Sequence, residues 1–291
     1  MPEPSNGGSG PRAVRHRVPV DVSRGGRRRP PAADVPAPSF QKRKSMANVA
    51  QSSRWLRKFH AAPEQAPQLV CFPYAGGSAG WFSKLSAELA GDVQVSSVQY
   101  PGRLDRLRDR PVDDLSELAD QVFAALDDSR PLALLGHSMG AVVAFEVARR
   151  LQAASVPVSH LFASGRVAPH LRRDGGVHLM SDDDVIAVVE SLGGVEPGVL
   201  RDVELRAMVL PVVRNDYRAI ETYRHHPAAP LTAPITALVG VNDPLVSASD
   251  ASEWSQHTSG PFSLVELPGG HFFPVSQWKA VADLVRRGLA E

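Results

Sequence analysis

The sequence predicts an α/β protein in which helices cover both faces of a mostly parallel β-sheet. Short apolar runs alternate with longer segments whose apolar residues have helical spacing, from about residue 53 onward. Strands that alternate with helices imply right-handed crossovers, which leave the strands parallel and buried. In addition, a serine between two glycines, Ser138, marks the point where one apolar run gives way to a helical segment.

The strands are expected at six apolar runs. The first run ends at Pro73, and the second ends just before Pro101 and Gly102, residue types that interrupt strands. The six runs are residues 69–72, 93–98, 132–135, 160–163, 235–239 and 262–267. The spacing of apolar residues predicts helices at residues 78–90, 115–126, 139–151 and 276–289.

A long segment after the fourth predicted strand contains no convincing strand of its own. A helix is expected to start at Ser181, which three aspartates follow, and to stop at the glycine pair 193–194. One or two further helices are expected over residues 203–223, broken near Pro211. Helices inserted between two strands of a sheet predict a lid at about residues 170–230. An insertion that has only a structural role would give the same pattern.

The composition is that of an ordinary globular protein, with 43% hydrophobic and 22% charged residues in a chain of 291. Cys71 is the single cysteine, so no disulfide forms within the chain and we expect a reducing compartment, the cytoplasm. The apolar run around Ser138 is interrupted by polar residues and followed by Glu146, which argues against a membrane span.

The N-terminal segment differs from the rest of the chain. Residues 1–46 contain ten Lys or Arg, three Asp or Glu, and eight prolines. Such a segment cannot bury enough surface to offset its conformational entropy, so we expect residues 1–50 to be a disordered extension and residues 51–291 to be the folded domain. Its basic clusters could bind an acidic surface, but a solvated tail, or sequence upstream of a start at Met46, explains it more simply. The remainder has a net negative charge, which gives no reason to expect nucleic acid.

Ser138 lies in the pentapeptide GHSMG, which matches the pattern Gly-x-Ser-x-Gly. A nucleophile between a strand and a helix needs a sharp, strained turn, and the flanking glycines leave room where a Cβ would collide with a neighbouring element. The turn raises the Ser138 hydroxyl above the edge of the sheet. It also places the Met139 N–H at the start of a helix, where it can donate to a developing oxyanion.

A serine hydroxyl needs a base to take its proton, and the base needs an acid to orient it. On such a sheet the order along the chain should be serine, acid, histidine. Asp243 follows the fifth predicted strand, and His271 lies in a glycine-containing loop after the last one. We therefore expect Ser138, Asp243 and His271 to act together as the catalytic residues. His225 and His226 do not have the spacing of metal ligands, and no metal is expected.

A second oxyanion donor is expected from the loop FPYAGGSAG, which follows the first predicted strand. Its glycines let a backbone N–H approach the substrate, and we assign this role to the Ala75 N–H. A phosphate cradle is the alternative for a glycine-rich loop, but neither G-K-[ST] nor G-x-G-x-x-G is present. Cys71 lies inside the preceding run, where a core position is expected.

Taken together, several motifs resemble the type II thioesterases, the discrete editing thioesterases of polyketide and nonribosomal peptide synthases. The resemblance covers roughly residues 53–290 and does not extend to residues 1–46. Its motifs are WLRKFH at 55–60, LVCFPYAGGSAGWF at 69–82, QYPGR at 99–103, GHSMGAVVAFE at 136–146, NDPLV at 242–246 and LPGGHFF at 267–273.

This resemblance implies an α/β-hydrolase fold with a mobile helical lid and a triad matching Ser138, Asp243 and His271. It implies hydrolysis of acyl groups from the phosphopantetheine thiol of an acyl carrier protein or peptidyl carrier protein, which regenerates stalled carriers. No cofactor is expected.

Contacts with the substrate are expected from Tyr74 and Gly76 in the glycine-rich loop and from Leu192 and Met208 in the lid. For the apolar lid residues, ordinary packing between the lid helices and the core is the alternative interpretation. Further apolar candidates in the lid are Val195, Leu200 and Leu210.

Four arginines follow the second predicted strand, on the side where α/β active sites open. They could contact a carrier protein or its phosphate, but a solvated strip paired with Asp105 and Asp109 is the simpler interpretation. The four are Arg103, Arg106, Arg108 and Arg110.

Three other functions remain open at this level. A serine esterase or lipase would use the same three residues on small oxygen esters. An acyltransferase or cyclase would need an amine or alcohol that outcompetes water. A non-catalytic scaffold of the same fold is the third, and the intact set of Ser138, Asp243 and His271 counts against it.

Overall fold

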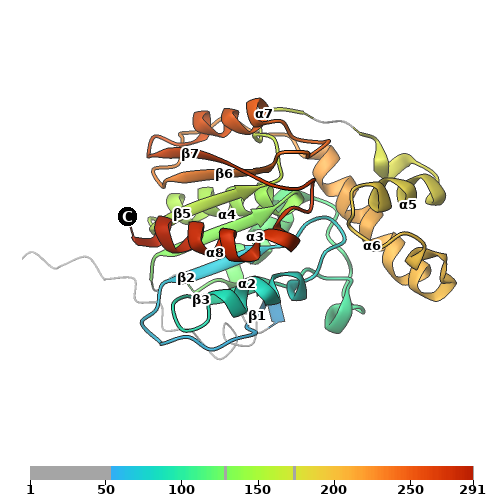
Figure 1. Cartoon of the computed structure of the whole chain (residues 1–291), viewed down its shortest axis with the longest axis horizontal. Coiled ribbons are helices and arrows are strands. Elements are labelled where there is room, and N and C mark those ends of the chain that lie inside the picture. The colour runs from blue at the N-terminus through green and yellow to red at the C-terminus, as the bar shows by residue number, and fades with distance from the viewer. Residues whose placement is uncertain (1–53, 128–129, 173–174, 291) are drawn as a thin grey trace, which may run out of the picture. The chain divides into compact units, whose positions relative to one another are not determined.

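A seven-stranded β-sheet is the framework of the residues that this computed structural model describes, namely 54–127, 130–172 and 175–290 (Figure 1). The strands lie in the order β1-β3-β2-β4-β5-β6-β7, and all neighbours are parallel except β1 and β3. The predicted α/β class is therefore confirmed, while the extension expected at residues 1–50 lies outside the described residues. The strands are β1 Leu56–Arg57, β2 Gln68–Phe72, β3 Gln94–Val98, β4 Leu132–His137, β5 Val158–Ser164, β6 Ile235–Gly240 and β7 Phe262–Leu267.

Helices cover both faces of this sheet. Figure 1 shows α2 and α8 on one face and α3 and α4 on the other. The helices are α2 Ser83–Glu88, α3 Leu115–Ala125, α4 Met139–Ala153, α5 Asp182–Ser191, α6 Val203–Thr222, α7 Ala248–Ser252 and α8 Pro274–Ala290. None of them is long and apolar enough to cross a membrane.

Strand β4 shows why residues 132–135 are all apolar. Leu132 and Leu134 belong to the core cluster that includes α3 and α4, whereas Ala133 and Leu135 belong to the cluster that includes α2 and α8. Successive side chains of a strand point to opposite faces, so a strand segment covered on both sides favours apolar residues at every position. This burial fixes the strand that leads into Ser138.

Two predicted helices differ from those observed. The segment expected to be one helix at residues 78–90 is a 3₁₀ turn, Ala79–Phe82, followed by the short helix α2. The predicted break near Pro211 is wrong, because α6 continues through this proline as one helix. Leu210, Val212 and Val213 on either side of it are buried, and their packing offsets the lost backbone hydrogen bond. The edge strand β1 and the five-residue α7 were not predicted, since both are too short to carry a periodic signal.

The described residues between β5 and β6 form no strand, and we call α5, α6 and the turns around them the helical insertion. Ser181 begins α5 as expected, because its hydroxyl accepts the N–H of Asp184. Figure 1 shows α5 and the first part of α6 standing beyond one end of the strands. The insertion therefore lies at the end of the sheet where Ser138 follows β4.

Candidate active site

Ser138 lies on a sharp turn between β4 and α4. Its φ of 55° and ψ of −120° are rare for a residue with a side chain and cost about 1–3 kcal/mol. The flanking glycines are required for close approach, since a Cβ on Gly136 would lie 2.1 Å from the carbonyl oxygen of Gly140. The steric role predicted for these glycines is confirmed.

His271 links Ser138 to Asp243 through two hydrogen bonds. Its Nε2 lies 3.1 Å from Ser138 Oγ, and its Nδ1 lies 2.9 Å from Asp243 Oδ2. A carboxylate only accepts, so Nδ1 carries the proton and Nε2 accepts from the serine hydroxyl. The side chains of His271 and Asp243 are 3% and 0% exposed, and this low-dielectric setting strengthens both bonds. Such an arrangement can take a proton from Ser138 and return it to a leaving group.

The loops that carry the acid and the histidine lie side by side because β6 and β7 are parallel neighbours. Their last residues, Gly240 and Leu267, face each other in the ladder. The Asn242 N–H then donates to the Gly269 carbonyl at 2.9 Å, which holds the two loops together beyond the sheet. Adjacent strand ends thus bring the two loops together, although their triad side chains are 28 residues apart along the chain.

The loop after β2 makes a tight turn at Tyr74–Gly77. The Gly77 N–H donates to the Tyr74 carbonyl at 2.9 Å, and Gly76 has the φ of +80° that the third residue of a type II turn requires. The Ala75 N–H has no hydrogen-bond partner among the described residues. The Met139 N–H is the first of α4, where intrahelical partners are lacking. Both N–H groups are free to donate, and their role at an oxyanion stays a prediction.

The Gly76 N–H, in contrast, is already used. It donates to Asp216 Oδ2 at 2.7 Å, and Asp216 on α6 also pairs with Arg103. A contact of Gly76 with substrate stays a prediction, and such a contact would have to involve atoms other than this N–H. Sequence analysis missed Asp216, although a signal was present. Asp216 lies on the buried stripe of α6, in helical register with Val213 and Ala219, where a charge is unusual.

Aromatic rings pack next to Ser138 and His271, around their sequence neighbours His137 and Phe272. The Tyr74 ring lies 4.7 Å from that of Phe272, and the Trp81 ring lies 4.9 Å from the His137 imidazole. Complete burial, with a smaller contribution from neighbouring His271, holds the pKa of His137 well below its ordinary value. His137 is therefore neutral and does not oppose the positive charge that His271 acquires when it takes a proton.

A cavity of about 470 Å³ opens beside His271. The helical insertion supplies much of its wall, including Val188, Leu192 and Ile220. Leu192 lines this cavity, whereas Met208 is 50% exposed on α6 and does not line it. Contacts of either residue with substrate stay predictions.

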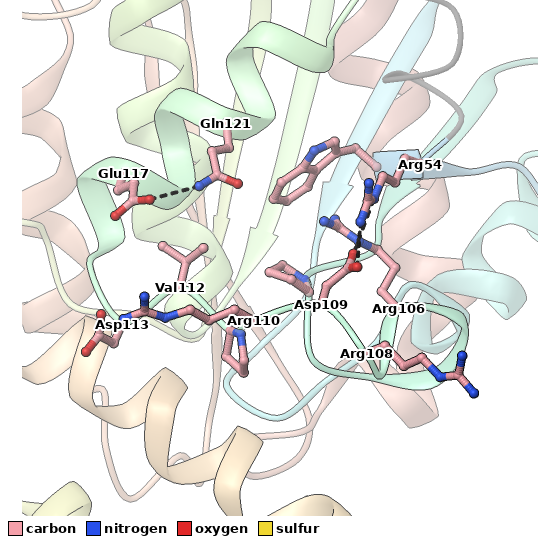
Figure 2. A pocket seen from close by; sticks show the side chains of 12 residues that line it. Arg54, Arg106, Arg108, Asp109, Arg110, Val112, Asp113, Glu117 and Gln121 are labelled. Atoms are coloured by element: carbon pink, nitrogen blue, oxygen red, sulfur yellow. Dashed lines mark hydrogen bonds and ion pairs between the residues drawn. The ribbon is translucent and has the colours of Figure 1, made fainter.

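The four arginines do not form one solvated strip, which corrects that expectation. Arg103 and Arg106 are each only 7% exposed, and Arg106 pairs with Asp109 while lying 4.1 Å above the ring of Trp55. Trp55, Arg106 and Asp109 line a hollow of about 700 Å³. Figure 2 shows Arg54 and Arg106 converging on Asp109, while the exposed Arg108 points away from the other side chains. None of the triad residues lines this hollow. Arg110 is also exposed, and Asp105 pairs with Arg57 rather than with the four arginines.

Metal-ligating side chains are not clustered in the described ranges of the chain. No group of three or more His, Cys, Asp or Glu residues there could hold a metal ion.

Comparison with known proteins identifies relatives over most of the chain. The family model described as "Thioesterase domain" matches residues 67–289. Thioesterase PikA5 of Streptomyces venezuelae is 45% identical over 250 residues, which are 82% of this chain and 89% of that protein. The probable cadicidin biosynthesis thioesterase of Streptomyces griseus is 42% identical over 285 residues, which are 95% of this chain and 78% of that protein. The solved structure of the type II thioesterase BorB, from the borrelidin biosynthetic cluster, matches with a TM-score of 0.75 and 44% identity, covering 81% of this chain and 97% of BorB.

Proposed function

The chain belongs to the thioesterase domain family, and from this membership we propose that it is a type II editing thioesterase of a polyketide or nonribosomal peptide synthase. It hydrolyses acyl groups from the phosphopantetheine thiol of an acyl or peptidyl carrier protein. Similarity to two biosynthetic thioesterases and to BorB supports the class of reaction. The carrier protein as the specific partner, and the cytoplasm as the location, are predictions.

The observation that carries the mechanism is the hydrogen-bonded series from Ser138 through His271 to Asp243. In the first step, His271 Nε2 takes the hydroxyl proton of Ser138 as Oγ attacks the thioester carbonyl carbon. The carbonyl oxygen becomes an oxyanion, to which the N–H groups of Ala75 and Met139 donate. The C–S bond then breaks, the thiol leaves with the proton from His271, and the acyl group stays on Ser138.

Water completes the reaction by the same route. His271 takes a proton from a water molecule that attacks the acyl-serine carbonyl, and the second oxyanion occupies the same two N–H groups. The ester bond to Ser138 then breaks, Oγ recovers its proton from His271, and the free acid leaves. Asp243 keeps Nδ1 protonated and stabilises the imidazolium in both steps.

The helical insertion acts as the lid of this site. This assignment is supported by the position of Leu192 and Ile220 in the wall of the cavity beside His271. A mostly apolar wall suits the acyl chain of the thioester, while the polar pantetheine arm stays outside.

The test is to measure acid release from a carrier protein loaded with a radiolabelled acyl group, next to an oxygen ester with the same acyl chain. We expect the thioester to be turned over faster than the oxygen ester. Equal rates on the two esters would favour a general esterase, and a product mass equal to acyl plus an added amine or alcohol would favour an acyltransferase.

A further inference from the structure

A buried ion pair joins the helical insertion to the loop after β3. Arg103 donates through both terminal nitrogens to Asp216, at 2.7 Å to Oδ2 and 2.9 Å to Oδ1. The side chains are 7% and 3% exposed. A two-pronged contact of this kind fixes the carboxylate in orientation as well as position.

The same pair contacts the turn at Tyr74–Gly77 at two points. Asp216 Oδ2 accepts the Gly76 N–H at 2.7 Å, and the Gly77 carbonyl accepts from Arg103 at 2.9 Å. The turn also packs on α6 itself, since a Cβ on Gly76 would lie 2.7 Å from a methyl carbon of Val213. The ion pair therefore braces this turn against the helical insertion.

These contacts determine where the Ala75 N–H points. The Tyr74 carbonyl and the Ala75 N–H belong to one planar peptide group, whose carbonyl is held by the Gly77 N–H. The next peptide group is held through the Gly76 N–H by Asp216. With both peptide groups fixed, the Ala75 N–H is left with one direction, and it is the only N–H of the three, at Ala75, Gly76 and Gly77, without a partner in the described structure.

Stability alone is a weak reason for this pair. Desolvating two charges offsets most of their attraction, and apolar residues of similar volume at such positions are often as stable. An apolar residue at position 216 could pack beside Val213 but could not accept the Gly76 N–H. An asparagine could accept this N–H through its one oxygen, but its NH2 group would face a donor of Arg103, so only an acid makes the contacts with the turn and with both Arg103 nitrogens together.

We propose that Asp216, oriented by Arg103, is a positioning residue that aims the Ala75 N–H at the oxyanion. This inference rests on the proposed function, which makes Ala75 an oxyanion donor. It also gives the helical insertion a second role. Its helix α6 contributes Ile220 to the cavity beside His271 and also carries Asp216, which holds the turn at Tyr74–Gly77.

The test uses an alkyl trifluoromethyl ketone, whose alkyl chain stands for the acyl chain of the substrate, labelled with ¹³C at the carbonyl. Such a ketone adds to a serine hydroxyl as a hemiketal, whose ionised oxygen occupies the oxyanion position. The pKa of this hemiketal, read from its ¹³C shift against pH, reports how well the N–H groups stabilise the anion. Only folded, occupied protein contributes to this signal, so a lower yield of folded protein does not change it.

In Asp216→Asn, we expect the hemiketal pKa to rise by about one or more, which corresponds to at least a tenfold weaker stabilisation of the anion. We expect kcat to fall about 10- to 100-fold, with KM within about threefold of the unmodified protein, since small displacements in an active site have effects of this size. If this variant does not fold, Arg103→Lys, which keeps the charge but loses the two-pronged contact, should change the same quantities in the same direction.

Glu146→Gln is the matched control. Glu146 is also a buried acid, and it pairs with Arg149 and Arg150 and accepts from the hydroxyl of Tyr223, the residue after α6. It does not touch the turn, so this variant should lose stability while its hemiketal pKa stays at the original value.

A hemiketal pKa that is unchanged in both Asp216→Asn and Arg103→Lys, with kcat falling only as the folded fraction falls, would overturn the inference and leave the proposed function intact. A protein of unaltered sequence that forms no hemiketal on Ser138 would instead refute the proposed function.

Discussion

The backbone of Gly140 lies so close to Phe72 that a Cβ on residue 140 would be 2.1 Å from the Phe72 carbonyl oxygen. The turn at Ser138 therefore sits directly against the end of β2, the strand that leads into the turn at Tyr74–Gly77. Gly140→Ala should destabilise the protein by about 1–3 kcal/mol and lower thioesterase activity, because either the turn or β2 must shift. Urea unfolding measures the first effect. Gly80→Ala is the control and should leave the free energy of unfolding unchanged, since its Cβ would meet nothing closer than Ser78 Oγ at 3.8 Å.

Removal of the Ser138 hydroxyl, the proposed nucleophile, should abolish turnover without loss of the fold. Ser138→Ala is expected to lower kcat by about a million-fold, as in other serine hydrolases that lose this oxygen. The decrease in kcat is measured as thiol release from an acyl-pantetheine thioester, followed with a thiol-trapping dye. A fluorophosphonate probe should label the unaltered protein at Ser138 and should not label the variant. Near-normal turnover in Ser138→Ala would remove Ser138 from its role.

The acid should matter through the tautomer of His271. In Asp243→Asn the side chain can donate to Nδ1, which places the imidazole proton on Nε2, facing the Ser138 hydroxyl. We expect kcat to fall by about 10⁴-fold with little change in stability. Asp92→Asn is a suitable control, because Asp92 pairs with Arg286 in an exposed contact. A decrease of less than tenfold in Asp243→Asn would argue that another residue orients His271.

The wall of the 470 Å³ cavity should set the length of acyl chain that is accepted. Leu192→Trp fills part of this space, so kcat/KM should fall about tenfold or more for long acyl chains and change little for acetyl. Competition between acetyl and longer acyl thioesters in one reaction gives the ratio directly. Val203→Trp is the control, since Val203 is 78% exposed at the start of α6 and does not line the cavity. An unchanged ratio in Leu192→Trp would place the acyl chain elsewhere.

Stability should decline on mild acidification because of His257. Burial, with smaller contributions from His225, His170 and Arg149, lowers the pKa of His257 to about 4 from an ordinary value of 6.5. Between these two pH values the unfolded chain binds more protons than the folded one. The contribution of His257 is therefore complete above about pH 6.5 and is lost as the pH falls toward 4, by up to about 3 kcal/mol.

Urea unfolding at pH 7.5, 6, 5 and 4.5 measures this dependence. We expect His257→Gln to be less stable at pH 7.5 but to lose less stability on acidification. The exposed His226→Gln should keep the full pH dependence. Parallel curves for His257→Gln and the unaltered protein would show that His257 does not contribute.

The sequence by itself determined the six strands β2 to β7 and the meeting of Ser138, His271 and Asp243. These features follow from local signals: apolar runs, glycines where the backbone must pass closely, and loops at the ends of parallel strands, which necessarily share one edge of the sheet. The strained turn at Ser138 was predictable for the same reason, since Gly136 and Gly140 each lie two residues from it in the sequence.

Only the tertiary structure decided which side chains lie together across long separations. The contacts of Asp216 with Arg103 and Gly76 span 113 and 140 residues, and no local pattern specifies them. The continuity of α6 through Pro211, the place of Leu192 in the cavity wall and the exposure of Met208 depend on how the helical insertion packs. Burial is a property of the assembled core. The partners of Asp216 on α6 are therefore known only once the loops that carry Gly76 and Arg103 are in place.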